Sequence, residues 1–571
     1  MRIEYRKPSQ EQILDPSLPS ILDRLYRNRG IQSFDEVTLT TQGLAHFREL
    51  YNSQKAAELI ASAMRAQEQI CIIGDFDADG ATSTALCKLA FKLFDYDKVD
   101  YLVPNRFDFG YGLSPEIVQL AYQNGAKLII TVDNGIACLP GVALAKELGL
   151  KVLITDHHLP GDALPNADVI VNPNQPDCDF PSKNLAGVGV AFYVMLALRS
   201  VLDQSKWFTE RQMTPPNLAS LLDIVAVGTV ADVVPLDKNN RILIHQGLQR
   251  IRSGKTRPGI KAIIEVAGRE LDKISASDLG FVIGPRLNAA GRLDDMATGI
   301  ETLIAPDIHQ ARLYASNLDS LNQTRKEIES SMQEQAKTVL DKLSLNEEDI
   351  PSGLVLYNEE FHQGVIGIVA GRIKERYNRP TIVFAQDEGG LIKGSARSIK
   401  GVHVRDLLDL IHKQSPDLIA KFGGHAMAAG LTIKEVHLSD FKQAFEAHAH
   451  QAMENLPKDA SIFCDGPLDV KQINLDTAHL LKIKVPWGQQ FEEPCFEGVF
   501  HLITQKIVGQ KHLKMVVSAQ GTEFDAIAFN IDTKIWPNTE AQKVRLVYKL
   551  DINSFRGNVS VQLLVDYLEA V

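Results

Sequence analysis

Four short apolar runs, each stopped by an acidic, amide or proline residue, constrain the fold of this chain more than any other feature. The runs are QICIIGD (69–75), KLIITVD (127–133), KVLITDHH (151–158) and ADVIVNP (167–173). Helix-like stretches, such as 81–94 and 139–149, lie between several of them. Strands that alternate with helices are typical of βαβ units, whose parallel sheet is buried between helices. The sequence therefore predicts an α/β domain with a parallel sheet.

The chain is too long for a single hydrophobic core. It has 571 residues, of which 45% are hydrophobic and 23% charged, a globular composition that excludes disordered, collagen-like and disulfide-scaffold classes. We expect five parts. They are a polar lead-in (1–45), the parallel-sheet domain (46–305), a connecting helix (306–345), a second, smaller α/β domain (346–457) and a C-terminal β-domain (458–571).

Two stretches support the later boundaries. Residues 307–343 contain no glycine or proline and are rich in helix formers, which predicts a long polar helix that bridges two domains. After about residue 460 the chain consists of short alternating segments, such as HLKMVVSAQ and KVRLVYKL. Five or so strands at this spacing favour a small β-barrel or sandwich.

Charge, cysteines and hydropathy suggest a cytoplasmic protein. The net charge of −11 argues against a broadly basic nucleic-acid coat, although a local groove can still be basic. The six cysteines are scattered without a CxxC pair, so we expect no disulfides. The first residues lack the apolar core of a signal peptide, and we expect no membrane span.

The densest chemistry lies at the predicted carboxyl ends of the strands. GDFDADG (74–80) places Asp75, Asp77 and Asp79 in five residues, directly after a strand. The next strands end with Asp133 and with the triplet 156–158, Asp-His-His. Ligand sites of open parallel sheets lie at this edge, so these side chains should converge, with Asp232 joining from a later loop.

Metal binding is the favoured interpretation of this cluster. Crowded carboxylates are costly to fold together unless cations or donors neutralise them. A solvated turn explains one acidic cluster but explains three at successive strand ends poorly, and a calcium loop of the EF-hand type would need a twelfth-position glutamate and two flanking helices. Carboxylates with imidazoles and no thiolate suit Mn²⁺ or Mg²⁺, and enough ligands exist for two ions.

These residues also resemble a known family. The motifs DFDADG, TVDNG, DHH at 156–158 and GTVADVVPL (228–236) are similar to the four motifs of the DHH phosphoesterase superfamily. The further segments NRFDFGYGL, LAGVGVAF, GPRLNAAGRL, HQGVIGIVAGR, GSARS and GGHAMAAGL resemble those of its single-strand-specific 5′→3′ exonucleases. The likeness runs in order from about residue 50 to the end.

The resemblance implies a ligand scheme. Asp77 would hold the first ion and Asp79 the second, with Asp133 bridging both, and His157 and Asp232 would complete the second site. Many superfamily members carry a histidine ligand where Ile73 stands, and here Asp75 would compensate. His158 would face the substrate phosphate, and with Asp133 it forms the expected catalytic pair. A structural histidine is the alternative for His158.

The resemblance further implies phosphate contacts. Ser395 and Arg397 occupy alternate positions of a probable extended segment and so share one face, which suits a terminal phosphate. With Arg106 they resemble a 5′-phosphate pocket. The other expected DNA contacts are Arg286, Arg292, Gly424 and His425.

Basic charge is concentrated in separate segments, although a solvated face is the alternative for each. Residues 241–300 and 367–405 have an excess of basic residues, and 501–520 contain three lysines and no acid. The C-terminal domain resembles an oligonucleotide-binding (OB) fold, which binds single strands by basic grooves and stacking. Trp487, Phe491 and Phe496 are stacking candidates, but core packing is the more common role of such aromatic residues.

We therefore expect a metal-dependent exonuclease that digests single-stranded DNA from the 5′ end in DNA repair and recombination. The alternatives are a small-substrate phosphodiesterase or pyrophosphatase, and a non-catalytic scaffold that holds single strands. The extra β-domain and the long bridging helix argue against the first, because a small anion needs no long groove. The intact ligand positions argue against the second. We expect a monomer, and the resemblance implies contact with single-stranded-DNA-binding protein.

Overall fold

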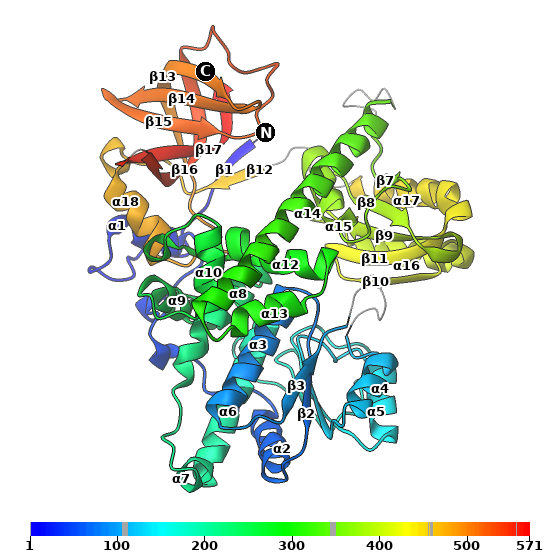
Figure 1. The fold of residues 1–571 in the computed structure, drawn as a ribbon. Coiled ribbons are helices and arrows are strands. Elements are labelled where there is room, and N and C mark those ends of the chain that lie inside the picture. Colours follow the sequence, from blue (N-terminus) through cyan, green and yellow to red (C-terminus); the bar gives the residue numbers. More distant parts are fainter. Residues whose placement is uncertain (1, 105–111, 343–349, 455, 457–460, 556) are drawn as a thin grey trace. The chain divides into compact units, whose positions relative to one another are not determined.

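The computed structural model describes residues 2–104, 112–342, 350–454, 456, 461–555 and 557–571. The chain divides into two compact units. Unit 1 contains residues 1–291, 295–319 and 461–571, and unit 2 contains residues 292–294 and 320–460. Each unit has its own sheets and core, and Figure 1 traces the elements of both. The five parts expected from sequence remain a prediction, because the structure divides the chain into only two compact units.

Unit 1 is built on the predicted parallel sheet. Its strand order is β3-β2-β4-β5-β6, and all neighbours are parallel. The strands are β2 (Ile70–Ile73), β3 (Val99–Leu102), β4 (Leu128–Val132), β5 (Lys151–Thr155) and β6 (Val169–Val171). The register pairs Ile73 with Thr131 and Val132 with Thr155, so these strands end side by side. The loops after β2, β4 and β5 therefore leave the sheet together at one edge.

Helices pack against both faces of this sheet. On one face, α4 (Pro115–Gln123) and α5 (Leu139–Glu147) form a buried cluster with strand residues such as Ile129 and Val152. Helices α2 (Ser53–Arg65), α3 (Ala78–Leu93) and α6 (Gly187–Gln204) pack against one another in the same unit. Helix α6 is long and apolar enough to cross a membrane, but 67% of it is buried among these neighbours. It is the core helix of this unit.

A helical layer follows the sheet along the chain. It consists of α7 (Trp207–Glu210), α8 (Leu222–Ala231), α9 (Lys238–Arg252), α10 (Pro258–Val266), α11 (Ala276–Asp278), the π-helical turn η6 (Leu279–Ile283), α12 (Gly284–Leu293) and α13 (Ala297–Ile304). The predicted long helix is α14 (Ile308–Lys342). Its first residues belong to unit 1, and from Ser320 onward it belongs to unit 2.

The C-terminal β-domain is a closed five-stranded barrel in unit 1, with strand order β13-β14-β15-β17-β16. The strands are β13 (Phe496–Val508), β14 (His512–Ala519), β15 (Thr522–Ala528), β16 (Lys543–Phe555) and β17 (Asn558–Ala570). The short helix α18 (Leu475–His479) precedes them. Closure satisfies the strand edges, so the barrel presents side chains rather than bare backbone to solvent.

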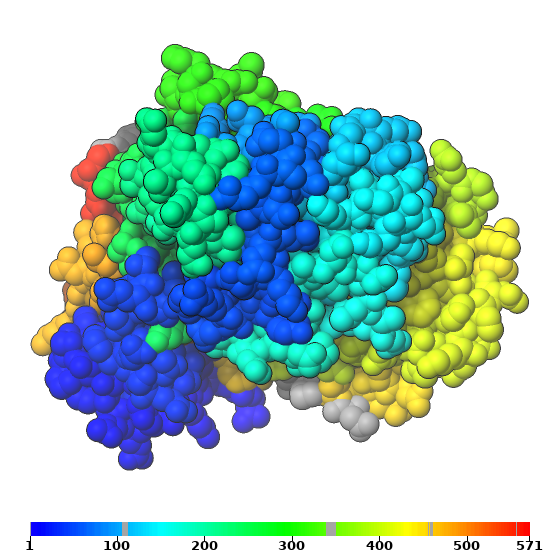
Figure 2. Space-filling view, turned by 90° about the horizontal axis from the view of Figure 1, so that it is seen from below, coloured from blue at the N-terminus to red at the C-terminus, as the bar shows by residue number. Residues whose placement is uncertain are grey.

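The N-terminal residues pack against the segment that leads into this barrel. Strand β1 (Arg2–Tyr5) pairs with β12 (Ser461–Cys464), and α1 (Ser20–Arg27) follows it. Just after α1, the buried guanidinium of Arg29 lies 3.0 Å from the buried carboxylate of Asp465. The deep-blue N-terminal residues and the orange segment accordingly lie next to each other in Figure 2. The predicted polar lead-in is therefore anchored by a distant part of the chain.

Unit 2 is the predicted second α/β domain. Its mixed sheet has the order β10-β11-β9-β8-β7, in which only β7 and β8 are parallel. The strands are β7 (Leu354–Tyr357), β8 (Thr381–Gln386), β9 (Leu391–Arg397), β10 (Lys421–Gly424) and β11 (Ala428–Lys434). Helices α16 (Val404–Gln414) and α17 (Leu438–Met453) share one buried cluster, and α15 (Ile366–Tyr377) shares another with α14.

Candidate metal centre

The carboxylates after β2 are held by the start of α3. Asp77 is the N-cap of this helix, and its Oδ1 accepts hydrogen bonds from the amides of Asp79 (2.9 Å) and Gly80 (3.0 Å). Asp79 lies in the first turn, buried, and accepts hydrogen bonds from the amides of Gly187 (2.5 Å) and Val188 (2.9 Å) at the start of α6. Two helix N-termini thus orient the acidic turn.

Glycines allow this close approach. A Cβ on Gly187 would lie 2.6 Å from Cβ of Asp133, and a Cβ on Gly228 of α8 would lie 3.0 Å from Oδ1 of Asp79. Helices α6 and α8 can therefore pack directly on the carboxylates. Asp133 itself has a φ of +62°, a left-handed conformation that Asp adopts more readily than most residues.

The histidines come from the end of β5. Nε2 of His157 lies 3.1 Å from Oδ1 of Asp133, 3.4 Å from Oδ2 of Asp232 and 3.9 Å from Oδ2 of Asp79. Asp232 is the C-cap residue of α8, so it joins the cluster from the helical layer as expected. The ligand atoms form three groups, each with its atoms within 4.8 Å of one another. The groups are Asp75-Asp77-Asp133, Asp79-His157-Asp232 and Asp133-His157-His158.

The donor set fits divalent cations of the Mn²⁺ or Mg²⁺ kind. It contains only oxygen and imidazole nitrogen, with Asp133 shared between two of the three groups. Among the described residues, the buried atoms Nε2 of His157 and Oδ2 of Asp232 have no hydrogen-bond partner, which is the state expected of ligand atoms. The structure thus brings together the predicted ligands, whose individual roles remain predictions.

The metal-free cluster is electrostatically unfavourable. Burial, followed by the charge of Asp77, raises the pKa of Asp79 to about 7. Burial, then the neighbouring carboxylates, also raises the pKa values of Asp133 and Asp232 well above the usual range. Burial and the adjacent His158 lower the pKa of His157 to about 4, so its imidazole is neutral and able to coordinate a metal. Cations would relieve this repulsion.

Asp156 has a different role from the other carboxylates, from which the sequence pattern does not distinguish it. Its Oδ2 accepts a hydrogen bond from the Ile136 amide (2.9 Å), and its Oδ1 accepts those of His157 (2.7 Å) and His158 (3.1 Å). The same oxygen lies 2.7 Å from Nδ1 of His158. Burial lowers the pKa of His158, but the hydrogen bond and charge of Asp156 outweigh it and raise that pKa to about 9. Asp156 therefore orients the imidazole of His158 and holds the backbone of both histidines.

Two polar residues of α12, Arg286 and Asn288, are bonded to other parts of unit 1. Arg286 forms an ion pair with Asp319, with Nη2 2.7 Å from Oδ1, and its Nη1 donates to the carbonyl of Val282. Its guanidinium is therefore already engaged. Asn288, two residues further along α12, accepts a hydrogen bond from the Ala78 amide at 2.8 Å and so holds the acidic turn. Arg106 lies outside the described residues.

The predicted phosphate contacts of unit 2 gather at the end of β9. Ser395 and Arg397 lie on one face, and Nη1 of Arg397 donates to Oγ of Ser395 at 3.1 Å. A Cβ on Gly367, in the first turn of α15, would lie 2.9 Å from both Ser395 Oγ and Arg397 Nη2. The hydroxyl and guanidinium thus meet a helix N-terminus, a favourable place for an anion.

The glycine-rich turn is adjacent to this pocket. Arg397 pairs with Ala428 of β11, Gly424 is the last residue of β10, and His425 begins the turn that leads to β11. Gly424 has a φ of +142°, and a Cβ there would lie 2.5 Å from the Ala428 carbonyl oxygen, so this position requires glycine. Arg292 of the same unit donates to the carbonyl of Gly364 at 3.1 Å.

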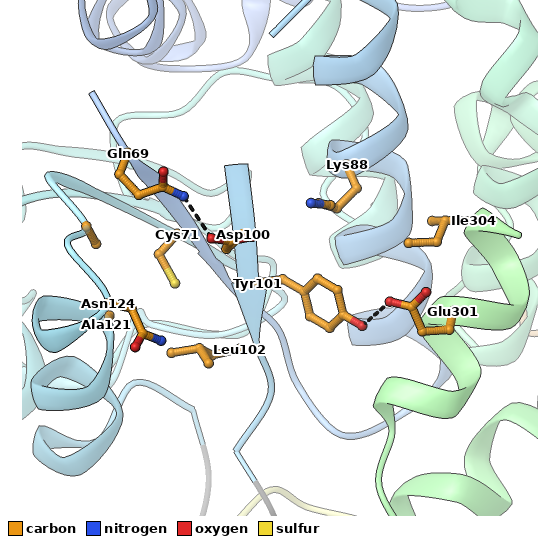
Figure 3. A pocket seen from close by; sticks show the side chains of 11 residues that line it. Gln69, Cys71, Lys88, Asp100, Tyr101, Leu102, Ala121, Asn124, Glu301 and Ile304 are labelled. Atoms are coloured by element: carbon orange, nitrogen blue, oxygen red, sulfur yellow. Dashed lines mark hydrogen bonds between the residues drawn. The ribbon is translucent and has the colours of Figure 1, made fainter. Parts of the chain in front are cut away.

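A separate cavity of about 390 Å³ lies at the edge strand β3 (Figure 3). Four of its polar side chains form two hydrogen-bonded pairs. The Tyr101 hydroxyl donates to Glu301 of α13 at 2.6 Å, and Gln69 donates to Asp100 at 2.9 Å. It contains none of the clustered ligands, so we assign the chemistry to the strand ends instead.

The aromatic candidates of the barrel region belong to the core. Trp487, Phe491 and Phe496 are buried, and the first two rings stack with centroids 5.2 Å apart. The six cysteines are free thiols, as expected. An exposed aromatic ring is present instead at Phe529, which follows β15 and is 52% exposed beside the ring of His512.

The fold and the clustered ligands define a protein of the DHH phosphoesterase class. The model of the DHH family N-terminal domain matches residues 69–229, that of the DHHA1 domain residues 351–453 and that of the RecJ OB domain residues 464–567. The chain belongs to the RecJ family. It is 52% identical to the single-stranded-DNA-specific exonuclease RecJ of Salmonella typhimurium, over 99% of this chain and 98% of that one.

Solved structures agree with this assignment. RecJ of Thermus thermophilus in complex with Mn²⁺ is similar with a TM-score of 0.76 and 27% identity, over 96% of this chain and 76% of that one. The Mg²⁺ complex of RecJ from the same organism gives a TM-score of 0.70 at 25% identity, over 96% and 74%.

Proposed function

We propose that this protein is a metal-dependent exonuclease that hydrolyses the phosphodiester bonds of single-stranded DNA from the 5′ end and releases mononucleotides. The observation that carries the proposal is the convergence of five carboxylates and a neutral imidazole from three strand ends and the end of α8. This convergence occurs in a chain that is 52% identical to an exonuclease specific for single-stranded DNA. The relatives with bound Mn²⁺ and Mg²⁺ support the choice of ion.

The ions would be held by Asp75, Asp77 and Asp133 on one side and by Asp79, His157 and Asp232 on the other, with Asp133 shared. Bound divalent ions would supply positive charge that polarises the scissile phosphate and makes water a better nucleophile. The chain's own contribution is to fix these ligands in a buried, preorganised arrangement, because their amide donors and helix ends do not have to move.

His158 would contact the substrate phosphate. Its pKa of about 9 makes it a cation at neutral pH, and Asp156 occupies its Nδ1. The other ring nitrogen, Nε2, would donate a hydrogen bond to a phosphate oxygen. A neutral histidine at this place would supply less stabilisation of the negative charge that develops at phosphorus.

Polarity and strand binding would come from other elements. Ser395 and Arg397 would bind the terminal 5′-phosphate, with Arg106, Arg292, Gly424 and His425 as further backbone contacts. On the barrel, Lys506 and Lys514 pair across β13 and β14. We propose that their outward face binds the strand by charge. Arg286 would act in this scheme only by exchanging its ion pair with Asp319 for a phosphate.

We place this activity in DNA repair and recombination, in a monomeric cytoplasmic protein that contacts single-stranded-DNA-binding protein. These assignments follow from the family resemblance. Light scattering of the purified protein, alone and mixed with that partner, tests both the monomer and the contact.

The decisive experiment is digestion of 5′- and 3′-labelled strands, single and double, with Mn²⁺, Mg²⁺ or EDTA. We expect loss of the 5′ label first, from single strands only, and no reaction in EDTA. The matched inactive variant is Asp133→Asn, because asparagine tolerates the left-handed conformation of this position but cannot serve as a charged bridge. It should still bind DNA. Normal turnover by this variant, or digestion from the 3′ end, would contradict the proposal, and cleavage of only small phosphodiesters would favour the alternative enzyme.

A further inference from the structure

Phe281 is an exposed aromatic residue in the catalytic part of the chain. It lies in the π-helical turn η6, between α11 and α12, and is 81% exposed. Large apolar side chains that face solvent to this extent are informative when they lie next to a functional site. π-Helical turns are themselves frequent at such sites. No feature of the sequence distinguishes Phe281 from a core residue.

Two glycines place this turn against the end of α8 that carries Asp232. A Cβ on Gly280 would lie 3.2 Å from Cγ1 of Val230, and a Cβ on Gly284 would lie 3.1 Å from Cβ of Ala231. Phe281 lies between the two glycines in sequence. The close approach therefore places the backbone of the Phe281 turn beside the last turn of α8, immediately before the metal-ligand candidate Asp232, while the Phe281 side chain faces solvent.

The other end of the same helical segment is tied to the acidic turn. A Cβ on Gly291 of α12 would lie 1.8 Å from the carbonyl oxygen of Phe76. Asn288 accepts the hydrogen bond of the Ala78 amide described above. The segment from η6 through α12 thus runs from Asp232 to the turn that contains Asp77 and Asp79, with Phe281 at its Asp232 end.

Val233 adds a second exposed apolar group at this place. It directly follows Asp232, is 63% exposed and has a φ of +61°. A β-branched residue is strained in the left-handed region, and such strain persists at functional sites where the surroundings hold it. The carboxylate of Asp232 is itself partly open to solvent, with 21% of its side chain exposed. Phe281 and Val233 are thus two exposed apolar side chains near the carboxyl end of α8, which carries Asp232, and we call them the apolar rim.

We propose that Phe281 stacks on a base of the substrate strand close to the scissile phosphate, with Val233 as the apolar edge of the same contact. This inference rests on the proposed function. An enzyme that digests every sequence needs base contacts that do not read base edges, and stacking on an aromatic face meets that condition. The two faces of a base within a duplex are already stacked on its neighbours. The contact would therefore also favour single strands over duplexes.

The test is a double-mutant cycle between protein and DNA. The protein variants are Phe281→Ala and Phe281→Tyr, and the substrates are 5′-phosphorylated single strands that are intact or carry one abasic residue at the first, second or third nucleotide. On intact strands, Phe281→Ala should lower kcat/KM about tenfold, and Phe281→Tyr should stay near the unmodified protein. When the abasic residue is at the stacked position, kcat/KM of the unmodified protein should also fall about tenfold. The kcat/KM of Phe281→Ala should be nearly the same on that strand as on the intact strand.

Three controls separate this outcome from damage to the site. Tyr122→Ala removes another exposed ring of unit 1, on α4, and should leave kcat/KM unchanged. Phe281→Leu keeps an apolar side chain without a π-face and should behave like Phe281→Ala. Thermal stabilisation by Mn²⁺ should be equal in all variants, because none removes a ligand.

The stacking contact would be overturned if, at all three abasic positions, the losses in kcat/KM from the Phe281→Ala change and from the missing base multiplied. A normal kcat/KM of Phe281→Ala on intact strands would also overturn it. The second result is the one expected if the rim binds a protein instead. Failure of the unmodified protein to digest single strands would refute the proposed function itself, so the two failures are distinguishable.

Discussion

Nδ1 of His158 lies 2.7 Å from Oδ1 of Asp156, and that oxygen also accepts the hydrogen bonds of two backbone amides. Both carboxylate oxygens of Asp156 accept hydrogen bonds from the chain, so Asp156 orients the histidine residues instead of binding an ion. Residues that orient metal ligands commonly matter for metal affinity and for activity, although they do not touch the ion.

Replacing Asp156 with asparagine should therefore weaken both metal binding and catalysis. The amide side chain keeps the size of the carboxylate but loses its charge and one acceptor, so His157 and His158 lose their fixed orientation. We expect a loss of about 10–100-fold in Mn²⁺ affinity or in activity, measured by calorimetry and by digestion of labelled strands. Normal values of both would show that Asp156 has only a structural role in the turn.

Stabilisation by metal should increase with pH. The folded-state pKa of Asp79 is raised from 3.8 to about 7, so in the metal-free protein its contribution to stability is present below about pH 4 and lost as the pH rises through 7. Asp133 and Asp232 act in the same direction. Bound Mn²⁺ requires the ionised carboxylates and removes their repulsion.

The rise in Tm on adding Mn²⁺ should therefore be large at pH 8 and small at pH 5, measured by thermal unfolding against an EDTA control at each pH. Burial raises the pKa of Asp156, but the hydrogen bond and charge of His158 outweigh it and lower that pKa, which acts in the opposite sense. Asp232→Asn is the matched variant and should show a smaller increase with pH. A metal-induced rise in Tm that is constant from pH 5 to 8 would contradict the assignment of these carboxylates as ligands.

Arg397→Ala should slow the digestion of strands that carry a 5′-phosphate. Loss of a charge-assisted, bidentate contact costs on the order of 1.5–3 kcal/mol, which is about tenfold or more in rate. Strands with a 5′-hydroxyl should be affected much less. Ser395→Ala, which removes the hydroxyl beside the guanidinium, should show the same preference with a smaller loss. Equal slowing on both substrates would mean that Arg397 supports the fold or the general groove.

The barrel lysines should contribute to the salt dependence of DNA binding. Lys506 and Lys514 lie directly opposite each other, and like charges at such positions do not stabilise a sheet. Nζ of Lys514 lies 3.8 Å from Oδ1 of Asp525, but a pair this exposed contributes little to stability. The double variant Lys506→Gln/Lys514→Gln should therefore fold normally. The slope of log affinity against log salt should become shallower by about 1.4, since each single-strand phosphate contact contributes about 0.7.

Fluorescence anisotropy of a labelled single strand in EDTA measures this slope. The matched control is Lys146→Gln/Lys151→Gln, two partly exposed lysines that have acidic partners and lie outside the three basic segments. Point variants are preferable to removal of the barrel, because truncation would leave the buried Arg29 without Asp465. An unchanged slope would identify these lysines as part of a solvated face.

The sequence by itself determined the local elements and the chemical type of the site. Apolar runs ended by Asp75, Asp133 and Asp156 predict parallel strands whose ends meet, because such strands share one direction and one edge. The stretch without glycine or proline predicts α14 almost to the residue. These features depend on conformation within a few residues, which periodicity and residue type encode directly.

Only the tertiary structure decided which distant groups complete the site. Asp79 receives its amide hydrogen bonds from Gly187 and Val188, more than a hundred residues away, and Arg286 is engaged by Asp319. The sequence likewise does not distinguish buried from exposed aromatic residues, because Phe491 lies in the core and Phe281 faces solvent. The physical reason is that periodicity specifies one face of an element, whereas the group that covers that face depends on how remote elements pack.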